Sequence, residues 1–268
     1  MFAPPQIRSR HVRRVTVAIT ALVTLATVAV GCGGGDGGGA TLGKKVTTTT
    51  TPVATTMSPP SWQSTIATAK VPTLDVFDAP NAAKPSNELP NPWLVDPDVP
   101  DSKVTQVFLV KDQRPDGWVK VLLPVRPNGS TGWVRASDVT LTANPFSIKV
   151  ELGAHRITVM KAETQIYQGT VAVGAKATPT PKGEYYLRVL IRAPDPTTVY
   201  GPYAYGLSSH SEVLETFAGG DAEVGIHGNN DASVLGKDVT HGCVRMDNDA
   251  ITMLSKQLPL GTPVEVIA

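Results

Sequence analysis

The sequence is poor in cysteine, in aromatic residues and in any excess of one charge. Two of its 268 residues are cysteine, 6% are aromatic, and 24 basic residues nearly balance 23 acidic ones. With a net charge of +1, the chain offers no electrostatic reason to expect a nucleic acid or an acidic surface as partner. Glycine (24) and proline (23) are abundant instead. This composition is typical of short strands joined by many turns, together with some unstructured chain.

Residues 1–32 resemble an export signal. Several arginines precede an uncharged apolar stretch, Val15 to Val30, which is short for a membrane span but suits a signal peptide. The stretch ends at Cys32 in a sequence that resembles a bacterial lipobox, with Ala29 where leucine is usual. This resemblance implies that Cys32 is lipidated; the alternative is an uncleaved signal anchor. Both place the rest of the chain outside the cytoplasm.

The two cysteines are expected to have separate roles. An exported protein with two cysteines ordinarily suggests one disulfide. Cys32, however, ends the apolar segment, and Cys243 lies far away within His-Gly-Cys. Between the signal and the first predicted strands, residues 33–62 are rich in glycine and threonine, so we expect a flexible stalk that buries no core.

Residues 63–143 are expected to form a small β-domain. Short strands are predicted at 107–110, 118–123 and 132–134, and Pro-Asn-Gly at 127–129 is a hairpin turn signal between the last two. The segment resembles a bacterial SH3-like β-barrel, mainly through the residues from Gly132 onward.

Residues 145–268 are predicted to be a second, β-rich domain. Apolar and polar residues alternate from Phe146 to Leu152, which indicates a half-buried strand. One helix is predicted near the C-terminus, capped by Asp247 or Asn248. Its apolar stripe consists of Ala250, Ile251, Leu254 and Leu258. The predicted fold class is therefore mainly β, with one or two short helices.

Candidate chemistry is concentrated in two short segments, Ile226-His227-Gly228 and Thr240-His241-Gly242-Cys243-Val244-Arg245. A thiol becomes a good nucleophile when a nearby imidazole takes its proton or stabilises the thiolate. Glycines let the backbone approach a substrate and offer N–H groups to an oxyanion. From spacing alone, structural roles or a zinc site with two histidines and one cysteine remain alternatives, although no C-x₂-C pair accompanies them.

These segments resemble the signature of the L,D-transpeptidases, the YkuD-type catalytic domain. Further similarity lies in Thr178-Pro179-Thr180-Pro181-Lys182-Gly183 and in Gly261-Thr262-Pro263-Val264, so the resemblance extends from Phe146 to the C-terminus. It implies a β-rich enzyme domain that acts on peptidoglycan stem peptides and uses no metal or organic cofactor. Together with the export signal and the lipobox, it implies a location facing the cell wall, tethered to the membrane.

The resemblance assigns a role to each site residue. Cys243 is the nucleophile, His227 the proton donor and acceptor, and the Gly228 carbonyl orients His227. The N–H groups of Gly242 and Cys243 form the oxyanion hole, and His241 shapes the pocket through a hydrogen bond. The candidates for substrate contact are Thr240, Tyr203, Tyr205 and Arg245.

The implied reaction is acyl transfer from a donor stem peptide to an amine of an acceptor stem peptide, which forms a 3→3 cross-link. Carbapenem-type β-lactams are expected to acylate Cys243, because their strained carbonyl mimics the scissile amide. Two alternatives remain: a cysteine carboxypeptidase or amidase that trims the same peptides, and a non-catalytic wall-binding lipoprotein.

Overall fold

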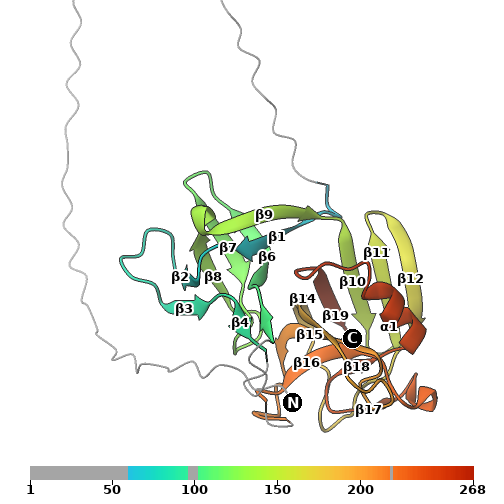
Figure 1. Ribbon diagram of the computed structural model, residues 1–268. Coiled ribbons are helices and arrows are strands. Elements are labelled where there is room, and N and C mark those ends of the chain that lie inside the picture. The colour runs from blue at the N-terminus through green and yellow to red at the C-terminus, as the bar shows by residue number, and fades with distance from the viewer. Residues whose placement is uncertain (1–59, 96–101, 218–219) are drawn as a thin grey trace, which may run out of the picture. The chain divides into compact units, whose positions relative to one another are not determined.

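The computed structural model describes residues 60–95, 102–217 and 220–268 (Figure 1). Strands dominate these ranges, which contain a single α-helix, so the prediction of a mainly β chain is confirmed. The predicted signal segment, Cys32 and nearly all of the predicted stalk lie outside the described residues. No helix within the described ranges is long and apolar enough to cross a membrane.

The N-terminal sheet has five strands in the order β8-β7-β6-β1-β9. They are β1 (Ser64–Ala69), β6 (Val107–Gln113), β7 (Trp118–Leu122), β8 (Thr131–Arg135) and β9 (Val139–Asn144). A 3₁₀ turn, η1 (Ala136–Asp138), joins β8 to β9. All four neighbouring pairs are antiparallel, and the hairpin predicted around residues 127–129 is confirmed by the pairing of β7 with β8. The resemblance to an SH3-like barrel stays a prediction.

Two short strand pairs accompany this sheet. They are β2 (Thr73–Val76) with β3 (Asn87–Pro90), and β4 (Trp93–Leu94) with β5 (Lys103–Val104). Trp118 is 6% exposed and meets Phe77 edge-on, with 5.1 Å between ring centroids. Trp118 is therefore a core residue, whereas Trp133 on β8 is half-buried.

The C-terminal sheet has eight strands in the order β12-β11-β10-β19-β14-β15-β16-β18. They are β10 (Phe146–Glu151), β11 (Arg156–Lys161), β12 (Thr164–Thr170), β14 (Gly183–Arg192), β15 (Tyr203–His210), β16 (Glu223–His227), β18 (Val244–Arg245) and β19 (Pro263–Ile267). The pairs β10–β19 and β16–β18 are parallel and the other neighbours antiparallel. A separate parallel pair joins β13 (Val173–Gly174) to β17 (Asp238–Thr240), and η2 (Ala232–Val234) is a 3₁₀ turn before β17.

The helix α1 (Asn248–Leu254) begins as the sequence predicts. Asp247 is its N-cap, and the Asp247 side chain accepts a hydrogen bond from the Ala250 N–H at 2.9 Å. The helix ends earlier than its apolar stripe, because the last turn tightens: the Gln257 N–H donates three residues back, to the Leu254 carbonyl. Leu258 is nevertheless buried in the same core.

The two sheets are continuous in the chain and in their packing. Only Pro145 separates β9 from β10. Tyr186 of β14 is fully buried in the core of the N-terminal sheet, where its ring centroid lies 6.4 Å from that of Phe108. A Cβ on Gly261 would lie 2.6 Å from the Ile66 side chain. The chain between α1 and β19 therefore packs closely against β1.

Candidate active site

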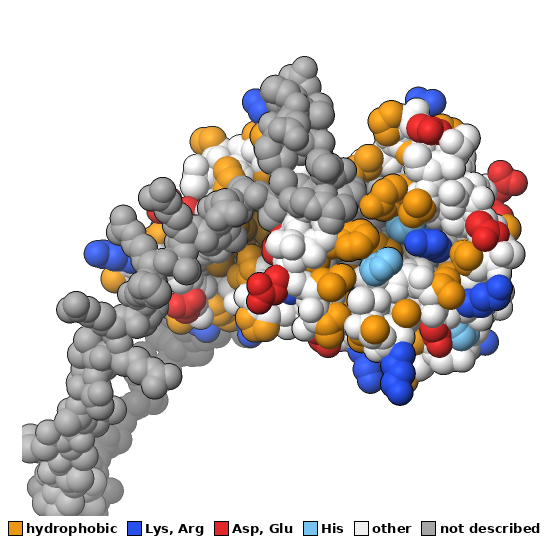
Figure 2. All heavy atoms as spheres, turned by 90° about the horizontal axis from the view of Figure 1, so that it is seen from below, with side chains coloured by type: hydrophobic (Ala, Val, Ile, Leu, Met, Phe, Trp, Pro, Cys, Tyr) orange, Lys and Arg blue, Asp and Glu red, His pale blue; other side chains and the backbone are white. Residues whose placement is uncertain are grey.

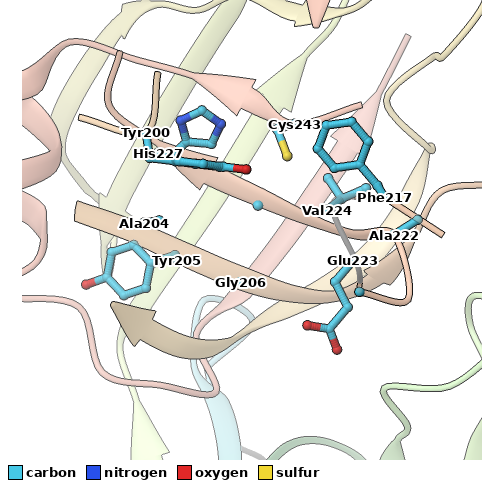
Figure 3. Close-up of a pocket in the computed structure, with 12 residues that line it drawn as sticks. Tyr200, Ala204, Tyr205, Gly206, Phe217, Ala222, Glu223, Val224, His227 and Cys243 are labelled. Carbon is cyan, nitrogen blue, oxygen red and sulfur yellow. The ribbon is translucent and has the colours of Figure 1, made fainter. Parts of the chain in front are cut away.

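The register of β16 and β18 brings His227 and Cys243 to one face of the C-terminal sheet. In this parallel pair Ile226 is opposite Val244 and His227 is opposite Arg245. Opposite residues share a face, and residues two apart on a strand share it as well. His227 and Arg245 therefore lie on one face, and so does Cys243, which directly precedes β18. Figure 3 shows the imidazole of His227 and the sulfur of Cys243 bordering the same pocket.

A short turn with its own hydrogen bonds holds the nucleophile segment. Thr240 is 1% exposed. Its hydroxyl donates to the Cys243 carbonyl at 2.6 Å and accepts from the Gly242 N–H at 3.1 Å. The Gly242 φ of +114° is unfavourable for any residue with a Cβ. The His-Gly-Cys sequence is thus explained by backbone geometry as well as by chemistry.

His227 is held as a neutral base of defined tautomer. Its side chain is buried (2% exposed), and its Nδ1 lies 2.7 Å from the Gly228 carbonyl oxygen. A carbonyl only accepts, so Nδ1 carries the proton and Nε2 is the ring nitrogen left to accept one. Burial lowers the pKa of His227 to about 4, the Arg245 charge adds to this effect, and the backbone contact at Gly228 opposes it. At neutral pH the ring is therefore uncharged.

Two asparagines fix the backbone after His227: Asn229, which the sequence analysis did not single out, and Asn248, which it named only as a possible helix cap. The Asn229 N–H donates to the Asn248 side-chain oxygen at 2.8 Å, and the Asn248 amide donates to the Asn229 carbonyl at 2.9 Å. A Cβ on Gly228 would lie 2.3 Å from that Asn248 oxygen. The glycine at position 228 therefore lets α1 hold the carbonyl that orients His227.

Burial raises the pKa of the Cys243 thiol, while a backbone hydrogen bond from Gly225 and the Arg245 charge act in the opposite direction. The side chain is half-buried. Combined with the lowered pKa of His227, this favours a neutral thiol beside a neutral imidazole over a thiolate–imidazolium pair. The arrangement suits a base that removes the thiol proton during attack.

Backbone N–H groups at the nucleophile differ in availability. The Gly242 N–H is engaged by the Thr240 hydroxyl. By contrast, the ladder between β16 and β18 leaves the Cys243 N–H without an acceptor among the described residues. Of the two predicted oxyanion donors, the Cys243 N–H is therefore the one free to receive a new oxygen.

Aromatic rings line two sides of the pocket. The Tyr200 ring centroid lies 5.1 Å from that of His227, and the Phe217 centroid lies 5.2 Å from that of His241. Tyr200 and Phe217 both line the pocket with the small residues Ala204, Gly206, Gly220 and Ala222. Neither ring is among the predicted site residues, since nothing in the local sequence reports which tyrosine faces the nucleophile. Figure 2 shows a face on which hydrophobic side chains border histidine side chains.

Two of the four predicted substrate contacts, Tyr205 and Thr240, have hydroxyl groups that are already bonded within the protein. The Tyr205 ring is 1% exposed, and its hydroxyl lies 3.2 Å and 3.3 Å from the Leu254 and Leu258 carbonyls. Tyr205 lines the pocket as predicted, but its hydroxyl is bound to the end of α1 and is not available to a substrate. Thr240 is likewise committed to its own turn.

The other predicted contacts lie nearer the surface. Tyr203 is half-buried and is not among the pocket-lining residues. Arg245 is half-buried, and its Nε is enclosed without a partner in the described structure. His241 is exposed, and its ring contacts Phe217; it makes no hydrogen bond to the described residues, unlike the shaping bond predicted for it. The described ranges contain no group of three or more His, Cys, Asp or Glu placed to hold a metal ion.

Comparisons with known proteins find similarity in the C-terminal part of the chain. Residues 145–266 match the family model of the L,D-transpeptidase catalytic domain, YkuD. The chain is 32% identical over 122 residues to the candidate L,D-transpeptidase YkuD of Bacillus subtilis. It is 31% identical over 122 residues to the Bacillus licheniformis protein of the same name. Each alignment covers 46% of this chain and 66% of the relative, so the chain spans just under two thirds of these relatives.

Solved structures show a weaker likeness. A crystal structure of a mutant Enterococcus faecium L,D-transpeptidase is 21% identical, with a TM-score of 0.37, over 46% of this chain and 50% of that chain. An L,D-transpeptidase from Mycobacterium smegmatis is 13% identical, with a TM-score of 0.39, over 61% of this chain and 90% of that chain. On the family match and the curated relatives, residues 145–266 are similar to the catalytic domain of the L,D-transpeptidases.

Proposed function

We propose that this protein is a cysteine L,D-transpeptidase that forms 3→3 cross-links between peptidoglycan stem peptides. The observation that carries the proposal is that Cys243 lines the same pocket as a neutral His227 whose Nδ1 proton is committed to the Gly228 carbonyl. This leaves Nε2 as the proton acceptor on the face where Cys243 lies.

The first half-reaction makes a thioester. The Cys243 sulfur attacks the carbonyl carbon between the third stem residue and the terminal D-amino acid, and the thiol proton passes to His227 Nε2. The oxygen that becomes negative accepts a hydrogen bond from the Cys243 N–H. The C–N bond then breaks, and His227 returns the proton to the departing amine.

The second half-reaction transfers the acyl group. An amine on a second stem peptide attacks the thioester carbonyl while His227 accepts its proton. The C–S bond breaks, the new amide remains, and the proton returns to the Cys243 sulfur. Water as acceptor would instead release a shortened stem, which is carboxypeptidase activity.

The proposal also covers inhibition by carbapenems and attachment of the protein to the membrane. A strained β-lactam carbonyl presents the same electrophile to Cys243, so carbapenems are proposed as acylating inhibitors. The apolar segment before Cys32 supports export and a lipid anchor at that cysteine, which would place the enzyme next to its polymer. Incorporation of a labelled fatty acid in wild type but not in Cys32→Ser tests the anchor.

The function is tested by mass spectrometry of the full-length protein with a disaccharide-tetrapeptide donor. Wild type and Cys32→Ser are expected to release D-alanine and yield a cross-linked dimer, whereas Cys243→Ala does neither. Cys32→Ser is the matched control, because it removes the only other thiol of the chain. Release of D-alanine without a dimer would identify a carboxypeptidase. A wild type that forms neither adduct nor product would favour the wall-binding alternative.

A further inference from the structure

The segment between β15 and β16, residues 211–222, forms one side of the active-site pocket and is here named the β15–β16 loop. Its described residues are 211–217 and 220–222. Phe217, Gly220 and Ala222 line the pocket, and the Phe217 ring contacts His241 beside the nucleophile. The position of this loop therefore sets the width of the pocket.

Little apolar burial holds the β15–β16 loop in place. Val213 is 54% exposed and Phe217 is 40% exposed. Its own bonds are few: the Ser211 N–H donates to the Ala222 carbonyl at 2.9 Å, Phe217 and Gly220 exchange two backbone hydrogen bonds, and the Leu214 N–H donates to the Ser211 hydroxyl. A loop with so few buried apolar contacts is held in one position only if other bonds attach it to the rest of the protein.

Arg126, which lies between β7 and β8 of the N-terminal sheet, provides such bonds. Its guanidinium donates to the Ser211 carbonyl, to the Leu214 carbonyl at 3.1 Å and to the Asp221 carbonyl at 2.9 Å. The Arg126 Nε lies 3.6 Å from the Asp221 carboxylate. One planar guanidinium thus binds the beginning, the middle and the end of the loop, in addition to the backbone bond between Ser211 and Ala222, because it carries five donors in fixed geometry.

A neighbouring residue strengthens the same attachment. The Asn128 amide donates to the His210 carbonyl at 2.8 Å, and the Asn128 side-chain oxygen accepts from the His210 N–H at 2.9 Å. His210 is the last residue of β15. Arg126 and Asn128 therefore fix the point where β15 ends and the β15–β16 loop begins.

We propose that Arg126 is a positioning residue for the active site, through which the N-terminal sheet holds the β15–β16 loop against the donor stem peptide. The effect on turnover rests on the proposed function, whereas the effect on the loop does not. His227 and Cys243 are held by β16, β18 and α1, so removal of the guanidinium loosens the pocket without disturbing the reacting groups. Donor binding is weakened more than the chemical step.

The test uses full-length Arg126→Ala and Arg126→Lys, with Arg114→Ala as matched control. Arg114 lies in the same sheet region; its guanidinium forms an ion pair with exposed Asp116 in its own turn and lies 5.9 Å from the Trp133 ring centroid. Within the described structure no bond joins Arg114 to the β15–β16 loop. The first readout is cleavage by a glutamate-specific protease at Glu212 and Glu215, which are exposed within the loop. The second is the split between KM and kcat for D-alanine release.

Arg126→Ala is expected to raise the rate of cleavage in the loop and the KM for donor by about tenfold each, as loss of one or more charge-assisted hydrogen bonds implies. The kcat should stay within about twofold, and Arg126→Lys should lie between wild type and Arg126→Ala, since one ammonium cannot reach all three carbonyls. Arg114→Ala should match wild type. If Arg126→Ala fails to fold, Arg126→Lys carries the test.

The proposal is overturned if loop cleavage and KM stay at wild-type values, or if kcat falls as much as KM rises. Should wild type show no turnover at all, the proposed function fails, and the protease readout alone still decides whether Arg126 holds the loop.

Discussion

Alkylation of Cys243 by iodoacetamide reports the charge state of the Cys243–His227 pair directly, because only the thiolate reacts at an appreciable rate. Burial raises the pKa of this thiol above its ordinary value of 9.0, and His227 stays neutral until its pKa of about 4. We therefore expect no thiolate–imidazolium pair in the resting enzyme.

The expected change of the alkylation rate with pH follows from the direction of these two pKa shifts. Below its pKa, a thiol gains about tenfold in thiolate fraction with each pH unit. With a pKa above 9.0, the alkylation rate of Cys243 should rise about 100-fold between pH 6 and pH 8. A cysteine in a preformed ion pair, with a pKa of about 3.5–7.5, would change far less over this range.

Peptide mapping after timed exposure to iodoacetamide measures Cys243 separately from Cys32. His227→Gln is expected to leave the slope of alkylation against pH unchanged, since the imidazole does not hold the resting thiolate. The same substitution should lower donor acylation by about 10²–10⁴-fold, because the general base is lost. A rate that is flat from pH 6 to pH 8 in wild type and becomes steep in His227→Gln would refute the neutral pair.

Three further predictions concern stability and the nucleophile turn. Thr240→Val leaves the Cys243 carbonyl and the Gly242 N–H without their partner, so it should lower the free energy of unfolding by about 2–4 kcal/mol in urea titrations. Thr240→Ser keeps the hydroxyl and should retain most of the wild-type stability. An unchanged urea midpoint in Thr240→Val would contradict the stabilising role of the hydroxyl. Gly242→Ala, at φ +114° with 3.6 Å to the nearest atom, should lose about 1–3 kcal/mol to backbone strain, seen as a lower Tm, and equal stability would show that the turn is not strained. Burial lowers the pKa of both His210 and His227 from 6.5 to about 4. Between these pH values the unfolded chain binds protons that the folded chain does not. The free energy of unfolding therefore falls as pH drops from about 6.5 to about 4, by about 3 kcal/mol for each histidine. In unfolding titrations at pH 4.5 and pH 7, His210→Gln should shrink this loss, and an equal loss in the variant would rule out His210 as a source.

Patterns local in sequence determined much of this protein. The alternation from Phe146 to Leu152 predicts β10, and Asp247 before an apolar stripe predicts the start of α1; both are confirmed. The spacing of His227 and Cys243 with their glycines made them candidates for a base and a nucleophile, and the resemblance to the L,D-transpeptidases favoured these roles over a structural role or a zinc site. Each of these features depends on periodicity, capping or residue chemistry within a few residues, which a single sequence displays directly.

Only the tertiary structure decided which side chains border the pocket. Tyr200 and Tyr205 lie five residues apart in one turn-rich stretch and both line the pocket, yet the Tyr200 ring contacts His227 whereas the Tyr205 hydroxyl is bound to the end of α1. Arg126 reaches a carbonyl 85 positions away in the chain, and Asn229 is bound by Asn248. The face that a residue presents depends on the register of strands distant in sequence, and a shift of one residue reverses it. No local pattern carries that register, so the shape of the pocket is a property of the folded chain.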